Sequence, residues 1–523
     1  MLVFLVIGGL IIFSFIFIFF GKRMKMNRFA RIMAATSILS TIAVIGLAII
    51  LVNGQEHGKP NGGCMHIDVA DDVSHPFYNR VYFAGYFRER NYTVGMFGKH
   101  LNGENPSNFL PKGVDEMLIN GGGSYLDPTF TVGNRNALLE PPRSVTFDNC
   151  TATTGMSCYS TSIIGNASLA WIQRHIAAND DDNNNNKPFF ALISLKAPHI
   201  EDGEGFPKSI PAPWYLHDTV PESESKAPRT PNYNCSVEDH HWLVRSQLPM
   251  TAKEADEADQ LYVSRLKTLI SVDDLVHDLV QVLEDQAILS DTYLVFTSDN
   301  GYHLGQFRMP MGKWQAYEDD IRIPMMIRGP GIEPNVSSAI MATHVDLMPT
   351  LLGLAGQLEI PATMDGRNLA NCLIGEGGED CESSDSSVLV EYLSLGEILV
   401  RYNHTFDTSN HSFVALRLKQ FHTNESSVPD HWFYSFGSSG PNVMRDMKYV
   451  DYRDLRIDWD AAKSPLEIEV FDLDRDSYEM SNLHEVIHPT LLELLQEKLQ
   501  VLLRCQGDSC RQEHASGIDE VYR

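Results

Sequence analysis

Short apolar runs that end in turn residues alternate along this chain with one long stretch of helical periodicity. From about Lys253 to Gln286 the leucines and valines recur at helical spacing, which predicts a long helix with a buried face. The short runs are typical of buried strands, and the main ones are Tyr92 to Phe97, Phe189 to Leu195, Tyr293 to Thr297 and Ile323 to Ile327. We therefore expect an α/β fold with an open sheet between helices.

The N-terminal residues follow a different pattern, because two much longer apolar stretches occur there. Leu2 to Phe20 is long enough to cross a bilayer, and a basic segment separates it from a second stretch, from about Ile32 to Val52. The basic segment predicts a cytoplasmic loop, with the body of the protein luminal or extracellular. In the alternative, the second stretch is a signal peptide that starts at Met24 or Met26, and the mature protein is secreted or lysosomal.

The change in pattern along the chain predicts four regions. Residues 1–52 hold the apolar stretches, 53–76 form a polar linker, 77–386 form the main domain and 387–523 a smaller subdomain. Within the last region we expect strands near 388–392, 413–418 and 469–473, followed by a helix over 489–503.

Charge and cysteine content narrow the possible partners and compartments. The 523-residue chain has a formal net charge of −27, which argues against nucleic acid and requires a locally basic pocket for any polyanion. Eight cysteines and eight Asn-x-Ser/Thr sequons fit a chain exposed to an oxidising compartment. Cys505 with Cys510 and Cys150 with Cys158 are candidate disulfides, although spacing alone does not fix the pairing.

Candidate chemistry lies where the predicted strands end. Asp299 and Asn300 follow one strand directly and offer two side-chain oxygens of the kind that a hard cation such as Ca²⁺ binds. Lys313 follows in a Gly-Lys-Trp turn and could face an anionic substrate. Lys99 and His199 end two earlier strands, and histidine suits proton transfer near neutral pH. Taken singly, each of these residues also fits an ordinary surface turn.

The segment around these residues resembles the sulfatases, most closely the N-acetylglucosamine-6-sulfatase group. The shared residues are Ser-Asp-Asn-Gly-Tyr-His from Ser298, Gly-Gln-Phe from Gly305, Lys313, and Arg-Gly-Pro-Gly-Ile from Arg328. The resemblance also covers Gly98-Lys99, the Pro-His at His199, and His-Trp-Leu-Val-Arg from His241.

This resemblance implies a fold, an activity and a ligand. The fold is the mixed sheet of the alkaline-phosphatase superfamily, with helices on both faces and a small C-terminal α+β subdomain. The substrate is a sulfate ester on a glucosamine-containing glycan. Lys99 and Lys313 would hold the sulfate, His199 would assist the leaving oxygen, and Asp299 and Asn300 would ligate Ca²⁺. His100 is given no role, because many relatives place this histidine one position later.

The chain departs from the family pattern near its N-terminus. We find no Cys-x-Pro-Ser-Arg segment, which supplies the nucleophile of sulfatases, and Asp71-Asp72 lies too close to Lys99 to replace the family's aspartate pair. We therefore expect negligible hydrolysis of a sulfate ester by this 523-residue chain. A membrane-anchored, nucleophile-less protein that binds sulfated glycan is the main alternative, and a phosphatase on the same fold is a weaker one. Whether the N-terminus is genuine or an error of gene prediction stays open.

Overall fold

The computed structural model describes most of the chain beyond residue 82, together with one N-terminal strand. The described residues are 4–10, 83–100, 110–136, 142–148, 158–179, 187–201, 206–356, 359–375, 386–394, 399–401, 404–408, 411–421, 444–453 and 465–514. Across these ranges we find no helix that is both long enough and apolar enough to cross a membrane.

The first of two groups of strands in the main domain is a five-stranded sheet. Its order is β5-β4-β3-β2-β6, with β2 parallel to both β3 and β6 and the outer pairs antiparallel. The strands are β2 (Thr93–Lys99), β3 (Glu116–Asn120), β4 (Thr129–Asn134), β5 (Arg143–Thr146) and β6 (Phe189–Ser194). The predicted runs at Tyr92 and Phe189 thus form the adjacent strands β2 and β6.

The second group has four strands in the order β7-β8-β1-β9. The strands are β1 (Phe4–Leu10), β7 (Leu294–Phe296), β8 (Arg322–Arg328) and β9 (Ser337–Ser338). β1 is antiparallel to β8 and parallel to β9. Part of the run Leu2 to Phe20, which we expected to cross a bilayer, is therefore a sheet strand. The rest of that run and the stretch from Ile32 to Val52 lie outside the described residues.

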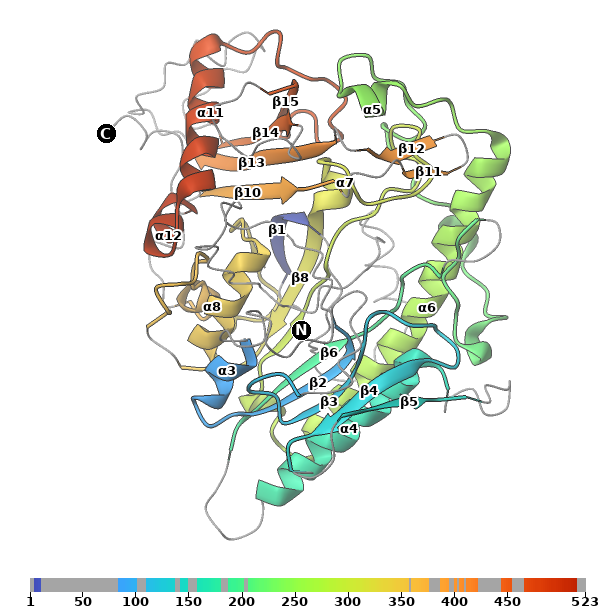
Figure 1. The fold of residues 1–523 in the computed structure, drawn as a ribbon, viewed down its shortest axis with the longest axis vertical. Helices are drawn as coiled ribbons and strands as arrows, with labels where there is room; N and C mark the ends of the chain where they lie inside the picture. The colour runs from blue at the N-terminus through green and yellow to red at the C-terminus, as the bar shows by residue number, and fades with distance from the viewer. Residues whose placement is uncertain are drawn as a thin grey trace.

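Helices pack on both faces of these strands (Figure 1). On one face, α4 (Ser160–Asn179) and α6 (Ala252–Asp285) share a hydrophobic core with β6 and β7. On the other face, α3 (Phe83–Arg88) and α8 (His344–Leu354) share a second core with the same strands. α6 begins at a capping box in which the side chains of Thr251 and Glu254 satisfy each other's backbone amides, which fixes its start near the predicted residue.

The C-terminal subdomain is an antiparallel sheet of order β10-β13-β14-β15, which the leucine face of α11 covers (Figure 1). Its elements are β10 (Ser386–Tyr392), β13 (Ser412–Phe421), β14 (Met444–Arg453), β15 (Glu467–Asp472), α11 (Pro489–Arg504) and α12 (Asp508–His514). The predicted disulfide between Cys505 and Cys510 is present. Cys158 is disulfide-bonded as well, and Cys150 lies outside the described residues.

The remaining described elements are short. They are η3 (Pro213–Tyr215), η4 (Glu222–Glu224), α5 (Trp242–Arg245), η5 (Leu289–Asp291), α7 (Glu318–Ile321), α9 (Ala370–Leu373), β11 (Leu399–Arg401) and β12 (His404–Asp407). The mixed sheet with helices on both faces and the C-terminal α+β subdomain confirm the predicted fold class. The boundaries of the four predicted regions stay predictions.

Candidate functional site

The predicted site residues follow the carboxyl ends of three strands. Lys99 is the last residue of β2, His199 follows β6, and Asp299 and Asn300 follow β7. Because β2 and β6 are parallel neighbours, Lys99 and His199 lie at the same edge of the sheet. Ligands in open α/β sheets bind at this edge.

Lys196 and Lys313 lie close enough to Lys99 to repel its charge, and we call these three residues the lysine cluster. Lys99 is only 5% exposed, and its pKa lies well below the usual value because of burial first and then the charge of Lys313. Lys196 lowers the pKa of Lys99 further, while Asp299 partly offsets the effect. Lys313 Nζ also donates to Asn300 Oδ1 at 3.4 Å. The structure thus brings Lys99, Lys313, Asp299 and Asn300 together, as the sequence predicted.

His199 belongs to the same site and is neutral in this arrangement. Its pKa lies well below the usual value, because of burial and then because of the charges of Lys99 and Lys313. Its Nδ1 contacts the carbonyl of Ile200 and is the natural donor to that oxygen, which leaves Nε2 with the free lone pair. Tyr125 holds the backbone nearby by donating from its hydroxyl to the His199 carbonyl at 2.8 Å.

Lys196 is the member of the cluster that sequence reasoning missed. It is 6% exposed, donates to the carbonyl of Gly123, and lies 5.0 Å from the centre of the Tyr125 ring. Its Nζ is also 3.6 Å from a carboxylate oxygen of Glu201. The sequence feature that could have identified Lys196 as a site residue is its position directly after a buried strand and three residues before His199. A lysine after a strand is usually a solvated turn residue, so the sequence pattern alone does not distinguish a solvated lysine from one that points into the site.

Two glycines make the close approach of β2 to its neighbours possible. Gly98 has a φ of +103°, and a Cβ there would lie 1.8 Å from the carbonyl oxygen of Ser194 on β6. Gly122, with a φ of +126°, leaves room for the Lys99 side chain, because a Cβ there would lie 3.1 Å from Lys99 Cε. Glycine is favoured at both positions, because the backbone has a positive φ and a Cβ would come too close to neighbouring atoms. The two glycines thereby allow Lys99 to reach the site.

The turn that follows β7 returns Lys313 to the site through a small hydrogen-bonded loop. His303 and Gly312 exchange two backbone hydrogen bonds, of 2.9 and 3.2 Å. The Asp320 carboxylate holds this loop in place, because it accepts hydrogen bonds from the His303 amide at 3.0 Å and from the Gln315 amide at 2.9 Å. The Gly-Tyr-His and Gly-Lys motifs therefore act as one unit that positions Lys313 opposite Asn300.

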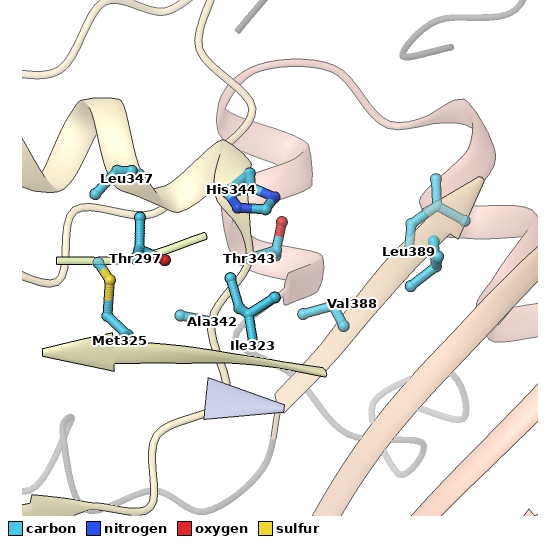
Figure 2. Close-up of a pocket in the computed structure, with 10 residues that line it drawn as sticks. Thr297, Ile323, Met325, Ala342, Thr343, His344, Leu347, Val388 and Leu389 are labelled. Carbon is cyan, nitrogen blue, oxygen red and sulfur yellow. The ribbon is translucent and has the colours of Figure 1, made fainter. Parts of the chain in front are cut away.

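A small apolar cavity of about 50 Å³ lies behind the β7 turn (Figure 2). Thr297, Met325 and Leu347 line it, together with His344 at the start of α8. His344 Nε2 lies 3.2 Å from the Ser298 carbonyl, and burial lowers the pKa of His344 to about 4. This neutral imidazole supports the backbone just before Asp299, so the cavity is a packing feature beneath the site.

The structure describes only two of the donors expected for the predicted Ca²⁺ site. Within the described ranges we find no group of three or more His, Cys, Asp or Glu side chains that could hold a metal. Ca²⁺ takes six to eight oxygen ligands, whereas Asp299 and Asn300 provide side-chain oxygens beside two lysines that disfavour a cation. The described arrangement is suited to an anion, and the role of Asp299 and Asn300 as calcium ligands stays a prediction.

Comparison with known proteins identifies the relatives of this chain. The family model described as Sulfatase matches residues 61–357. The chain is 30% identical to N-acetylglucosamine-6-sulfatase of Bos taurus over 374 residues, which are 68% of this chain and 57% of that protein. The human N-acetylglucosamine-6-sulfatase is also 30% identical, over 371 residues with the same coverage. This chain therefore spans 57% of the length of these relatives.

Other matches cover less of this chain or share less sequence identity with it. The extracellular sulfatase SULF-1 homolog of Drosophila melanogaster is 31% identical over 310 residues, which cover 59% of this chain and 25% of that protein. Among solved structures, a protein in complex with its substrate D-glucosamine-2-N,6-O-disulfate has a TM-score of 0.56 at 19% identity, with 81% of each chain covered. A protein from Bacteroides fragilis has a TM-score of 0.55 at 17% identity, covering 85% of this chain and 80% of that one. The two structures support the fold alone.

Proposed function

We propose, from the premise that this chain belongs to the sulfatase family, that its lysine cluster binds the sulfate group of a sulfated glycan. The observation that carries the proposal is the convergence of Lys99, Lys196 and Lys313 on His199. A buried group of like charges is unfavourable in the free protein, and a bound anion relieves the repulsion. The similarity to N-acetylglucosamine-6-sulfatases favours a 6-sulfated glucosamine unit as the substrate.

His199 has a defined part in this proposal. A sulfate ester carries one negative charge, which offsets the charges of Lys99 and Lys313 and so raises the pKa of His199 from its depressed value. Because Nδ1 already faces the Ile200 carbonyl, the added proton belongs on Nε2. From there it can be donated to the oxygen that leaves with the sugar, which is the general-acid step of ester cleavage.

The chemical step also needs an attacking group, and the printed sequence has no Cys-x-Pro-Ser-Arg segment to supply one. We therefore propose that the 523-residue chain binds the ester without measurable hydrolysis. A sulfuric ester hydrolase, as the family similarity implies, is the other candidate function, and the same purified chain distinguishes the two. Sulfate release that is lost in Lys313→Ala would establish a hydrolase and contradict binding without hydrolysis.

Binding is tested by titrating purified chain with N-acetylglucosamine-6-sulfate and with neutral N-acetylglucosamine as the control ligand. We expect saturable binding of the sulfated sugar only, weakened about 10–100-fold in Lys313→Ala, because a hydrogen bond between charged groups contributes about 1.5–3 kcal/mol. Lys253→Ala is the matched control, because that lysine side chain is 80% exposed at the start of α6. Equal affinity in Lys313→Ala and Lys253→Ala would overturn the proposal.

We further propose that the folded body lies in a lumen or outside the cell. The Cys505–Cys510 disulfide supports an oxidising compartment, and the sequon residues Asn91, Asn166 and Asn335 are exposed. The membrane anchor and the alternative signal peptide stay predictions, because most of residues 1–52 lie outside the described ranges.

A further inference from the structure

The turn after β6 that carries His199 is held by hydrogen bonds to several of its backbone carbonyls. The His199 amide donates to the Lys196 carbonyl at 2.8 Å, and the buried Ser209 hydroxyl donates to the Pro198 carbonyl at 2.7 Å. The Tyr125 hydroxyl donates to the His199 carbonyl at 2.8 Å. Tyr125 belongs to the loop between β3 and β4, 74 residues earlier in the chain. It therefore links a distant part of the fold to the peptide group that bears His199.

Tyr125 also contacts the member of the lysine cluster that lies on the same turn. The Lys196 ammonium is 5.0 Å from the centre of the Tyr125 ring, a distance at which an aromatic ring attracts a cation. The Tyr125 amide donates to Glu201 Oε2 at 3.0 Å, and the Glu201 carboxylate is 3.6 Å from Lys196 Nζ. Hydroxyl, ring and amide of one fully buried residue thus contact three positions of the turn.

We propose that Tyr125 is a positioning residue, which holds the His199 imidazole and the Lys196 ammonium in a fixed relation to each other. This proposal rests on the proposed function, in which Lys196 helps to bind the sulfate and His199 donates a proton to the leaving oxygen. His199 Nδ1 faces the carbonyl of Ile200, and the carbonyl that Tyr125 holds belongs to the peptide group between these two residues. A rotation of that peptide group would move the Ile200 carbonyl away from Nδ1. Tyr125 therefore keeps Nε2 as the nitrogen that faces the substrate.

The fold supplies a closely matched control for this role. Tyr159 is as fully buried as Tyr125, and the two rings stack with their centres 5.9 Å apart. The Tyr159 hydroxyl donates to the carbonyl of Ile210 at 3.0 Å, outside the turn that carries His199. Removing either hydroxyl therefore deletes one buried hydrogen bond to a backbone carbonyl, and the two losses of stability should be similar. The effect on His199 should follow from the Tyr125 hydroxyl alone.

The first experiment measures His199 by NMR in the purified 523-residue chain with labelled histidine, and the His199 signal is assigned by its absence in His199→Gln. We expect one neutral form in the natural chain, with the proton on Nδ1. In Tyr125→Phe, both neutral forms should appear. The pKa of His199, which burial holds well below its usual value, should rise toward 6.5 as water reaches the loosened turn. Tyr159→Phe should leave both properties unchanged.

The second experiment uses N-acetylglucosamine-6-sulfate, the ligand of the proposed function. Tyr125→Leu should bind it about 3–10-fold more weakly than Tyr125→Phe, because only phenylalanine keeps an aromatic ring beside Lys196. Bound ligand should raise the pKa of His199 in the natural chain and in Tyr159→Phe, and by less in Tyr125→Phe. If the natural chain does not bind this sugar, the proposed function fails. The NMR measurement without ligand still decides the role of Tyr125.

A third measurement needs no variant of Tyr125 and decides the question if Tyr125→Phe does not fold. In the natural chain, the Tyr125 hydroxyl proton should exchange with water at least about tenfold more slowly than that of Tyr478, whose residue is 40% exposed. Slow exchange together with a single Nδ1-protonated form of His199 supports the proposal. Equal exchange of the two hydroxyls would overturn it. So would the same His199 forms and pKa in Tyr125→Phe and Tyr159→Phe.

Discussion

Two buried lysines in this molecule have opposite surroundings. Lys448, on β14, is fully buried, and its Nζ contacts the Ala316 carbonyl at 2.7 Å, Glu318 Oε1 at 3.2 Å, and Glu479. Lys99, on β2, is equally hidden, but the charges that act on it are mainly those of other lysines. One lysine is neutralised by the protein itself, and the other is held among like charges.

This contrast separates a charge that holds the fold together from a charge that we propose binds sulfate. The attraction of Arg417 and then of Lys448 holds the pKa of Glu318 well below its usual value, so this carboxylate stays ionised and joins the two domains. In the lysine cluster, burial and then repulsion by Lys313 and Lys196 lower the pKa of Lys99, and Asp299 offsets only part of that repulsion. Burial of a lysine alone therefore does not identify a binding site. The sign of the charges around a buried lysine distinguishes a candidate binding residue from a structural one.

The largest effect is expected where the compensated pair is broken. Lys448→Met removes the cation that contacts both Glu318 and Glu479, so the ionised Glu318 loses one of its two buried partners. Loss of one partner of a buried ion pair costs about 3–5 kcal/mol, so we expect the free energy of unfolding to fall by that amount. Urea denaturation measures the change.

The double variant Lys448→Met with Glu479→Gln serves as the control. It should recover part of the loss, because the Glu479 carboxyl that faced Lys448 is replaced by a neutral amide and Glu318 keeps Arg417 at 3.0 Å. A loss below about 1 kcal/mol in the single variant would mean that the pair does not join the domains in the way described.

A smaller effect is expected from pH. Burial raises the pKa of Glu479 to about 8 in the folded protein, whereas the ordinary value is 4.5. Between these values the unfolded chain has released this proton and the folded chain still holds it, so stability falls as pH rises. We expect a decrease of roughly 2–4 kcal/mol from this group between pH 4.5 and 8.

Glu479→Gln removes the titrating group while it keeps an acceptor for the Glu318 amide, 2.7 Å away in the natural chain. Denaturation curves across that pH range should therefore be flatter for the variant. Parallel pH profiles for the variant and the natural chain would contradict the assignment.

The smallest effect is expected in the lysine cluster. Lys99→Met removes a buried charge that its neighbours repel, so stability near neutral pH should be unchanged or rise by about 1 kcal/mol. Because the folded pKa of Lys99 lies below the unfolded one, the natural chain should gain stability as pH rises toward 10.5, and the variant should lack this gain. Lys253→Met is the exposed control. A clear loss of stability in Lys99→Met would show that Lys99, like Lys448, stabilises the fold, and would contradict this prediction.

Much of the fold could be predicted because local pattern and long-range packing agree. The runs at Tyr92, Phe189 and Ile323 become β2, β6 and β8, and the helix predicted from Lys253 becomes α6. Lys99, His199 and Lys313 could be proposed together because each follows a strand and matches a family motif. Lys196 was missed because the sequence pattern of a lysine after a strand does not show whether its side chain points to solvent or into a site.

Other features depend on pairing that no local pattern records. The run from Leu2 reads as a membrane segment by hydrophobicity, because an apolar run does not distinguish a bilayer from the interior of a sheet. The structure pairs residues 4–10 of that run with β8 and β9.

The ion pairs around Glu318 also bear on the order in which the protein can mature during its synthesis. Glu318 lies five residues after Lys313, but its partners Arg417 and Lys448 are made about a hundred or more residues later. While the ribosome is still producing β13 and β14, Glu318 lacks Arg417 and Lys448, the two cations that it pairs with in the folded protein. Domains usually fold as units once complete. The turn that carries Lys313 is thus made early, but the ion pairs that hold the neighbouring Glu318 form late, and a nascent chain released before residue 448 would lack them.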